Sequence, residues 1–361
     1  MPDIQELLEE LSNAHGPSGF EGPVRAIVRR ELEPLVDAIE TDGLGSLQAR
    51  LGPEDRQPRV MLTAHMDELG LMVRRITAEG YVKFQTLGGW LDQSLINQRW
   101  VILTHSGPVP GVTGIKTVHV MQPKEREKVF ERTEMFIDIG ARSREDAETR
   151  LGVRPGDPVS PDSRFTHLAG GDLYLGKAWD DRIGVAVMIE VMRALAADPP
   201  TGTTTFAVAT VQEEVGLRGA ETSAYGIAPA VGINLESGVA GDYPGISEDE
   251  AQERIGEGPS LFLHDTSMLP NLRLRDFVVE TARDLDIPVQ FNVLSGYGQD
   301  GAAMQRARGG APAINIAVPT RYLHSHNGVI SRFDVDTTIH LVTEVVRRLD
   351  AEAIAGLRDF S

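Results

Sequence analysis

Four apolar segments of this chain each lead directly into side chains that can bind a metal ion. The segments are Arg59–Ala64, Thr203–Gln212, Ala230–Leu235 and Ala311–Val318. Short apolar runs of this kind are typical of strands that are buried on both faces. In an open α/β sheet, ligands bind in the crevice beyond the carboxyl ends of the strands. Side chains that are spread over the sequence can therefore meet at one edge of such a sheet.

The side chains that follow these segments are histidines and carboxylates. They are His65, Asp67, Glu213, Glu214, Glu236, His324 and His326. A further pair, Asp180 and Asp181, opens an apolar helix. Two histidines and four or more carboxylates at one edge suit a pair of divalent cations. Because the chain contains no cysteine, any metal must be held by histidine and carboxylate.

The order of the segments predicts an α/β fold, with a mostly parallel sheet and helices on both faces. Helices are expected at residues 4–14, 22–35, 183–197, 271–285, 301–308 and 334–349. From residue 69 to residue 160 the pattern changes to short β-type runs separated by glycine and proline. We therefore expect a host domain formed by residues 1–68 and 161–361, interrupted by a small inserted β domain at residues 69–160.

The formal net charge of −18 argues against nucleic acid and anionic membranes as partners. The N-terminal residues are acidic and amphipathic, which is not the pattern of a signal peptide. No apolar run approaches the ~20 residues of a membrane-spanning helix. We therefore expect a cytoplasmic protein.

His65 and Asp67 are two residues apart, so in a strand their side chains point to the same side. A carboxylate placed there can accept a hydrogen bond from one ring nitrogen and leave the other nitrogen free for a metal. A core histidine that is hydrogen-bonded to a neighbouring acid explains this pair equally well when it is considered alone.

Asp180 and Asp181 stand at the start of an apolar helix. Carboxylates at this place can cap the helix and interact favourably with its dipole. Alternatively, a carboxylate that reaches over the helix N-terminus can bridge two cations that lie ~3.5–4 Å apart.

Glu213 and Glu214 follow an apolar run without an intervening turn. Adjacent acids are common on solvated surfaces, but at the buried end of a strand they are costly unless cations neutralise them. Since adjacent side chains point in different directions, we expect two roles. One carboxylate binds a metal ion, and the other accepts a proton from water.

Residues 296–301 (GYGQDG) fit the G-x-G-x-x-G pattern of dinucleotide-binding sites. Such a site also needs an acidic residue about 20 positions further on, and residues 302–332 contain neither Asp nor Glu. We therefore interpret these glycines as a tight turn.

Four longer motifs occur in order along nearly the whole chain: TAHMDELGLMV, KAWDDRIGVAV, VQEEVGLRGA and VPTRYLHS. Together they resemble the glutamyl aminopeptidase and tetrahedral aminopeptidase family of two-metal exopeptidases. The resemblance implies a catalytic metallopeptidase domain, residues 1–68 and 161–361, and an inserted β domain, residues 69–160, for dimerisation or as a lid. It also implies a homo-oligomer, in which dimers can assemble into a hollow dodecamer.

By position, the resemblance implies a role for each candidate residue. His65 would bind one metal ion, Glu214 and His324 the other, and Asp180 would bridge both. Glu236 would be a further ligand. Glu213 would be the general base, and Asp67 would orient His65. The cofactors would be two divalent metal ions, zinc or cobalt.

Three positions depart from the family pattern. Glu236 stands where the family usually has Asp, and in the wider superfamily Glu at this position often accompanies carboxypeptidases and acylases. His326 stands where Pro is more common; it could contact the substrate, be a spare ligand, or be exposed and idle. Gln299 precedes Asp300 where Thr is more usual.

The sequence therefore predicts an aminopeptidase that hydrolyses N-terminal residues from peptides, using a metal-bridged water activated by Glu213. A metal-dependent deacylase or carboxypeptidase on the same fold is the alternative that Glu236 raises. Outside enzymes, an inactive metal-binding scaffold is a third interpretation.

Overall fold

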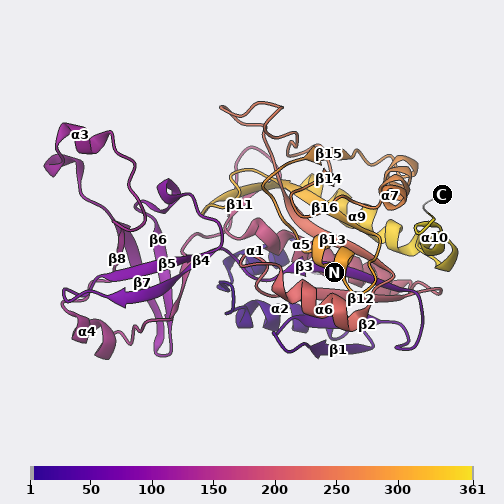
Figure 1. The fold of residues 1–361 in the computed structure, drawn as a ribbon, viewed down its shortest axis with the longest axis horizontal. Helices are drawn as coiled ribbons and strands as arrows, with labels where there is room; N and C mark the ends of the chain where they lie inside the picture. The colour runs from indigo at the N-terminus through magenta and orange to yellow at the C-terminus, as the bar shows by residue number, and fades with distance from the viewer. Residues whose placement is uncertain (1–3, 360–361) are drawn as a thin grey trace.

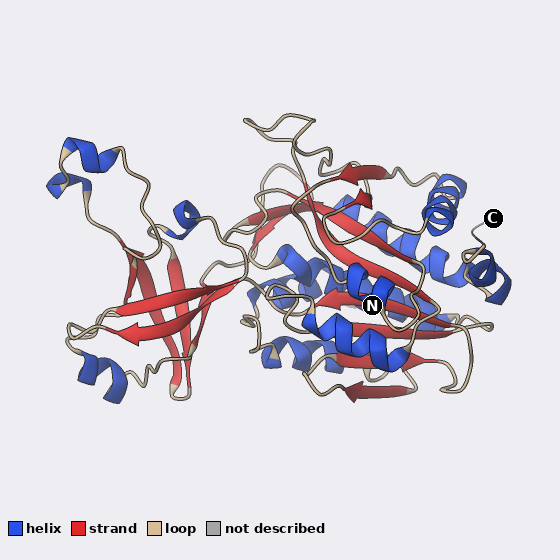
Figure 2. Ribbon diagram, viewed as in Figure 1, coloured by secondary structure: helices blue, strands red, loops and turns tan. Residues whose placement is uncertain are grey.

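The structure, a computed structural model, describes residues 4–359 and has two visibly separate parts (Figure 1). One part is a large sheet with helices packed on it, and the other is a β-barrel that protrudes from it (Figure 2). Both ends of the chain lie in the α/β part, and the barrel has the purple colours of the intervening residues. The chain therefore leaves the α/β part to form the barrel and then returns to it.

An eight-stranded mixed sheet forms the centre of the α/β part. In spatial order its strands are β1 (Ala38–Thr41), β2 (Leu47–Leu51), β12 (Thr204–Thr210), β3 (Arg59–His65), β13 (Val231–Val239), β16 (Ala313–Thr320), β14 (Ser260–His264) and β15 (Gln290–Val293). The central strands β12, β3, β13 and β16 are parallel to one another. Strands β2 and β14 pair with this group in the antiparallel direction. The predicted α/β class is therefore confirmed.

Helices cover both faces of this sheet. On one face lie α1 (Ile4–Asn13), α2 (Gly22–Leu32), α5 (Trp179–Ala197), α7 (Leu272–Asp284), α9 (Arg332–Arg348) and α10 (Ala351–Gly356), and on the other α6 (Arg218–Ile227) and α8 (Gly301–Arg306). Strand β3 contributes Val60 and Leu62 to the larger core and Met61 to the smaller one. Successive side chains of a strand point to opposite faces, so each face of β3 packs against its own helices.

Within residues 4–359, none of the helices combines the length and the apolar character needed to cross a membrane. The most apolar of the long helices, α5, is buried on nearly all sides, from Trp179 to Leu195. The backbone of Asp180 and Asp181 is not helical, with φ/ψ of −83°/103° and −121°/42°. The regular helix therefore begins after this pair, and its buried body fixes both carboxylates next to the sheet.

The barrel has six strands, is closed, and has a hydrophobic core of its own. In spatial order the strands are β4 (Gly70–Ile76), β5 (Val82–Leu87), β8 (Phe136–Asp138), β7 (Gly107–Gly114), β6 (Arg99–Thr104) and β9 (Pro158–Pro161). Its connections contain η1 (Asp92–Leu95), η2 (Val118–Val120), α3 (Pro123–Arg126) and α4 (Arg144–Thr149). Closure leaves no free strand edge within this barrel that could pair with another chain.

Several short strands differ from the sequence prediction. Glu236, which was expected just beyond a strand, lies inside β13, because β13 stays paired with β16 as far as Val239. Strand β14 was not predicted, and neither was the small sheet of β10 (Thr166–His167), β11 (Leu173–Gly176) and β17 (Gly328–Ser331). Strands of two to five residues carry little pattern of their own, and they form here because a partner strand is already in place.

Candidate metal centre

The five predicted ligand residues converge at the carboxyl edge of the central strands. They form two groups that share Asp180: His65, Asp180 and Glu236, and Asp180, Glu214 and His324. In each group, one ligand atom from every residue lies within 4.8 Å of the others. Four of these residues lie in or just after β3, β12, β13 and β16, and Asp180 opens α5. The parallel strands therefore bring to one place residues that are far apart in the sequence.

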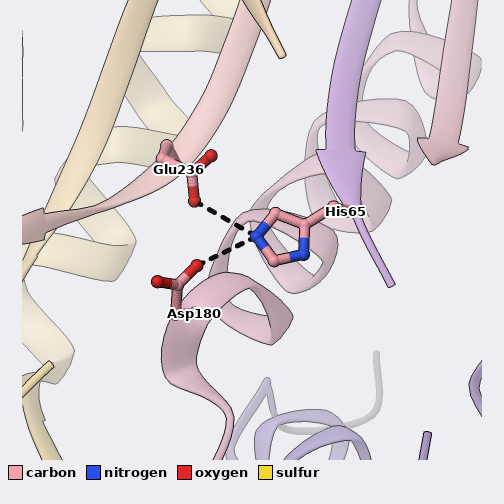
Figure 3. Close-up of side chains that lie close together, drawn as sticks. All are labelled: His65, Asp180 and Glu236. Carbon is pink, nitrogen blue, oxygen red and sulfur yellow. Dashed lines mark hydrogen bonds and ion pairs between the residues drawn. The ribbon is translucent and has the colours of Figure 1, made fainter. Parts of the chain in front are cut away.

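In the first group, the ring of His65 faces two carboxylates (Figure 3). His65 Nε2 lies 2.9 Å from Asp180 Oδ1 and 3.7 Å from Glu236 Oε1. His65 and Glu236 are buried, with 1% and 2% of their surface exposed. His65 Nε2, Asp180 Oδ1 and Glu236 Oε1 therefore point toward one another, as the ligand atoms of a single cation would.

In the second group, His324 faces the other oxygen of Asp180. His324 Nε2 lies 3.1 Å from Asp180 Oδ2 and 4.0 Å from Glu214 Oε2. The other ring nitrogen, Nδ1, lies 2.8 Å from the main-chain oxygen of Gly89, a residue of the β5–η1 connection of the barrel. This contact fixes Nδ1 as the donor and leaves Nε2 free as a ligand atom. The sequence contains no signal for it, because a main-chain oxygen makes it across 235 positions.

Asp67 lies beside His65, and both its main chain and its side chain contact the ring. His65 Nδ1 lies 2.9 Å from the main-chain oxygen of Asp67 and 3.5 Å from its Oδ1. The carboxylate of Asp67 also accepts hydrogen bonds from Ser18 Oγ at 2.7 Å, Glu213 N at 3.0 Å and Glu214 N at 3.2 Å. Because β3 ends at His65, the strand alternation behind the prediction no longer holds at Asp67. Asp67 therefore braces His65 through its main chain and the two glutamates through its side chain.

Glu213 and Glu214 occupy different positions, as their adjacency suggests. Glu214 belongs to the second ligand group, whereas Glu213 lies 3.9 Å from His65 Nε2 and belongs to neither group. Both line a cleft of about 320 Å³ together with Asp180, Glu236 and His324. Glu213 is 9% exposed, so its carboxylate is buried but reachable from the cleft.

The electrostatics of the centre indicate a shortage of positive charge. Burial raises the pKa of Glu213 and of Glu236 well above the usual range of a carboxylic acid. Burial and the nearby Asp180 raise the pKa of Glu214 to about 8. Burial alone would lower the pKa of His324, but the hydrogen bond that its ring donates to Asp180 and the charge of Glu214 outweigh this effect and raise the pKa to about 9. Carboxyl groups that resist ionisation beside histidines that attract protons are expected where buried acids lack counter-charges.

An unpartnered atom leads to the same conclusion. Glu214 Oε1 is buried and has no hydrogen-bond partner in the structure. Buried polar atoms are almost always paired, so an orphaned carboxylate oxygen in this place needs a partner. Divalent cations would supply both the partner and the missing charge, and the histidine and carboxylate donors fit such ions.

Asp181 has a different role from its neighbour. Its Oδ1 accepts a hydrogen bond from Gly184 N at 3.0 Å, and its Oδ2 accepts one from His65 N at 3.1 Å. It therefore caps the first turn of α5 and ties that helix to the end of β3. Of the two interpretations of the acid pair, capping applies to Asp181, while Asp180 lies in both ligand groups.

The glycine-rich turn forms one wall of the cleft, which the sequence did not predict. Gly296, Tyr297 and Gly298 line it, together with Gly216 and Leu217 from the segment after Glu214. The hydroxyl of Tyr297 donates to the main-chain oxygen of Ser237 at 2.9 Å, and its ring stacks on Phe262. This segment leads into α8, which begins at Gly301, and its position next to the ligand groups depends on the fold.

His326 is not exposed, and it belongs to neither ligand group. Its ring is 2% exposed and packs against Trp100 and Trp90, with ring centroids at 4.4 and 5.4 Å. Burial lowers the pKa of His326 to about 4. The idea of an exposed, idle histidine is therefore wrong for this residue.

Glu68, directly after Asp67, belongs to a buried ion-pair network behind the ligand groups. Lys177 Nζ donates to both oxygens of Glu68, at 2.7 and 2.6 Å. Glu68 Oε1 also accepts from Gly16 N and Ser160 Oγ, each at 2.9 Å. Ser160 lies in β9, so this network joins the N-terminal segment, the approach to α5 and the barrel.

The fold and this acidic, histidine-containing centre are those of a metal-dependent hydrolase. Comparisons of the chain with known proteins define the class of hydrolase further. The model of the M42 glutamyl aminopeptidase family matches residues 45–341. FrvX of Escherichia coli (strain K12) is 41% identical over 356 residues, which cover 98% of each chain. The solved TET aminopeptidase of the marine sediment archaeon Thaumarchaeota archaeon SCGC AB-539-E09 is 43% identical, with a TM-score of 0.95 over 98% of each chain. The TET1 peptidase of Pyrococcus horikoshii, which can assemble into a tetrahedron or a large octahedral shell, is 29% identical, with a TM-score of 0.86 over 96% of this chain and 100% of its own.

The chain belongs to the M42 glutamyl aminopeptidase family. It is a metal-dependent exopeptidase that removes N-terminal residues from peptides. The aminopeptidase prediction is therefore confirmed. The alternative that Glu236 raised, a deacylase or carboxypeptidase, is therefore not supported. The interpretation as an inactive scaffold is not supported either.

The ion pair behind the site yields a stability prediction. Lys177→Met should lower the free energy of unfolding by about 3–5 kcal/mol, because it leaves the carboxylate of Glu68 buried with its closest counter-charge removed. Urea unfolding followed by circular dichroism measures the loss. The double variant Lys177→Met with Glu68→Gln should recover part of it, since residue 68 then no longer carries a buried charge. A single variant as stable as the wild type would contradict this account.

Proposed function

We propose that this aminopeptidase holds two divalent metal ions, zinc or cobalt, one in each ligand group. His65 and Glu236 would hold the first ion, Glu214 and His324 the second, and Asp180 would bridge the two. The observation that carries the proposal is the placement of Asp180. Its Oδ1 lies 2.9 Å from His65 Nε2, and its Oδ2 lies 3.1 Å from His324 Nε2, so each oxygen faces a different group.

The donor set supports this assignment. Imidazole nitrogens and carboxylate oxygens are common zinc ligands, and imidazole also suits neighbouring transition metals such as cobalt. When bound, such a pair of ions would polarise the scissile carbonyl and lower the pKa of the attacking water. The chain's contribution is to hold the ligands in place, as Asp67 does for His65 and Gly89 does for His324.

Glu213 is the residue that we assign to proton transfer. Its carboxylate borders the cleft but belongs to neither ligand group, so it stays free to exchange a proton. The hydrogen bond from its main-chain N–H to Asp67 Oδ1, at 3.0 Å, fixes its position. Glu213 would accept a proton from the attacking water on its carboxylate and deliver it to the leaving amine nitrogen.

Glu213→Gln tests this role. The amide keeps the size of the side chain but cannot accept the proton, so we expect kcat to fall by about 10²–10⁴-fold. Bound metal should stay unchanged, because Glu213 is not a proposed ligand. The assay is hydrolysis of a free aminoacyl anilide, with metal content measured by mass spectrometry.

The matched control is Glu221→Gln, which changes an exposed carboxylate of α6 in the same way and should leave kcat unchanged. An N-acetylated anilide should resist the wild-type enzyme, because the free α-amino group is blocked. Full activity of Glu213→Gln would contradict the assignment of the base, and rapid hydrolysis of the blocked substrate would contradict an aminopeptidase.

We further propose that residues 69–160 form an inserted domain that mediates dimer contacts, and that dimers assemble into a larger shell such as a dodecamer. Apolar side chains on the surface of this segment support the proposal. Val118, Val120 and Val129, around α3, are 49%, 60% and 58% exposed. Exposed apolar patches commonly mark protein–protein contacts. The likeness to the Pyrococcus horikoshii TET1 peptidase is consistent with such an assembly.

Replacing Val120 and Val129 together by Glu should reduce the oligomer mass, because it places charges in an apolar contact. Multi-angle light scattering after size exclusion measures the mass. Leu272→Glu, at a leucine of α7 that is 62% exposed, is the matched control and should not change it. An unchanged mass for the double variant would place the contacts elsewhere.

A further inference from the structure

The segment 321–327, which connects β16 to β17, carries His324 and is held at both ends by the α/β part. Arg321 pairs with Asp242, with Nε 2.8 Å from Oδ1. At the other end, Trp179 Nε1 donates to the main-chain oxygen of Gly328 at 3.1 Å. We call residues 321–327 the ligand loop. Its two ends are fixed, and the placement of its middle decides where His324 points.

The middle of the ligand loop contacts the barrel. His324 Nδ1 donates to the main-chain oxygen of Gly89, as described above, and the ring of His326 packs against both Trp90 and Trp100. The His326 ring meets Trp100 nearly edge to face, at an interplanar angle of 77°. Contacts of this geometry are favourable for aromatic rings and restrict their orientation.

The two tryptophan rings contact each other edge to face, with centroids 5.6 Å apart, and His326 packs against both of them; we call this aromatic corner the slot. Trp90 Nε1 donates to the main-chain oxygen of Gly70 at 3.1 Å, and Trp100 Nε1 donates to Thr113 Oγ1. Both rings belong to the hydrophobic core of the barrel and are 6% and 0% exposed. The slot is therefore a fixed part of the barrel, and the ring of His326 is held against it.

The backbone of the ligand loop needs this support. His324 and Tyr322 have φ values of 55° and 59°, in the left-handed region that non-glycine residues seldom adopt. Such conformations persist only where the surrounding structure enforces them. Because both ends of the ligand loop are fixed, the contacts that His326 makes with the tryptophans are well placed to enforce the backbone conformation of His324.

We propose that His326 is a positioning residue: packed against Trp90 and Trp100, it keeps the imidazole of His324 in the second ligand group. The barrel thereby supports the Asp180, Glu214 and His324 group. The first group is braced differently, since His65 Nδ1 contacts the main chain of Asp67 within the α/β part. This inference rests on the proposed two-metal site, and it predicts that damage to the slot weakens one metal site selectively.

The test is a stepwise titration of the full-length, metal-free protein with Co²⁺. Calorimetry and the visible absorption of the bound ion measure each binding step. The wild type should bind two ions per chain. In His326→Ala, the first ion should bind as in the wild type, and the second should bind about 10–100-fold more weakly, the range seen when support of a ligand is removed. The absorption of the second ion should also change, because His324 is displaced. His326→Phe keeps a flat ring in the slot and should restore most of the affinity.

Ile137→Ala is the matched control. Ile137 is fully buried in the same barrel core, on β8, and its truncation should lower the thermal stability of the barrel without changing either metal affinity. Unchanged binding of both ions to His326→Ala would overturn the proposal. So would equal weakening of both ions, or a loss in Ile137→Ala as large as in His326→Ala. A wild type that binds fewer than two ions would instead contradict the proposed function itself.

Discussion

Buried negative charge at the carboxyl edge of the sheet is the constraint on which the rest of this structure depends. The carboxylates of Asp180, Glu213, Glu214 and Glu236 all lie within 4.0 Å of a ring nitrogen of His65 or His324. Buried carboxylates are costly unless they are paired or neutralised. Divalent cations would satisfy this requirement, and their binding would stabilise this edge of the fold. The same ions supply the chemistry of a metal-dependent aminopeptidase.

The chain holds this charge in place with groups that do not bind metal. Asp67 accepts hydrogen bonds from Ser18, Glu213 and Glu214 and fixes the acids at the end of β12. Asp181 ties α5 to β3, and the buried body of α5 keeps Asp180 between the two groups. The barrel reaches the site through Gly89, so catalysis and the inserted segment are physically connected. These contacts from several directions restrict the movement of the ligand side chains.

Much of the site could be predicted, because apolar strands that end in acids and histidines are visible in the sequence and parallel strands share an edge. His65, Asp180, Glu214, Glu236 and His324 follow from that reasoning together with the family resemblance, and the structure brings them together. What could not be predicted are contacts that main-chain atoms or distant elements make. The oxygens of Asp67 and Gly89 brace the two histidines, and His326 packs against two tryptophans of the barrel. Strand β14 and the extension of β13 past Glu236 depend on pairing partners, which local patterns do not contain.

Anomalous diffraction from crystals of the Co²⁺-loaded protein, recorded on either side of the cobalt absorption edge, tests the central claim most directly. The account predicts two anomalous peaks ~3.5–4 Å apart on either side of Asp180, the spacing of paired catalytic ions. One peak should contact His65 and Glu236, and the other Glu214 and His324. A single peak, or two peaks of which either lies away from these side chains, would contradict it.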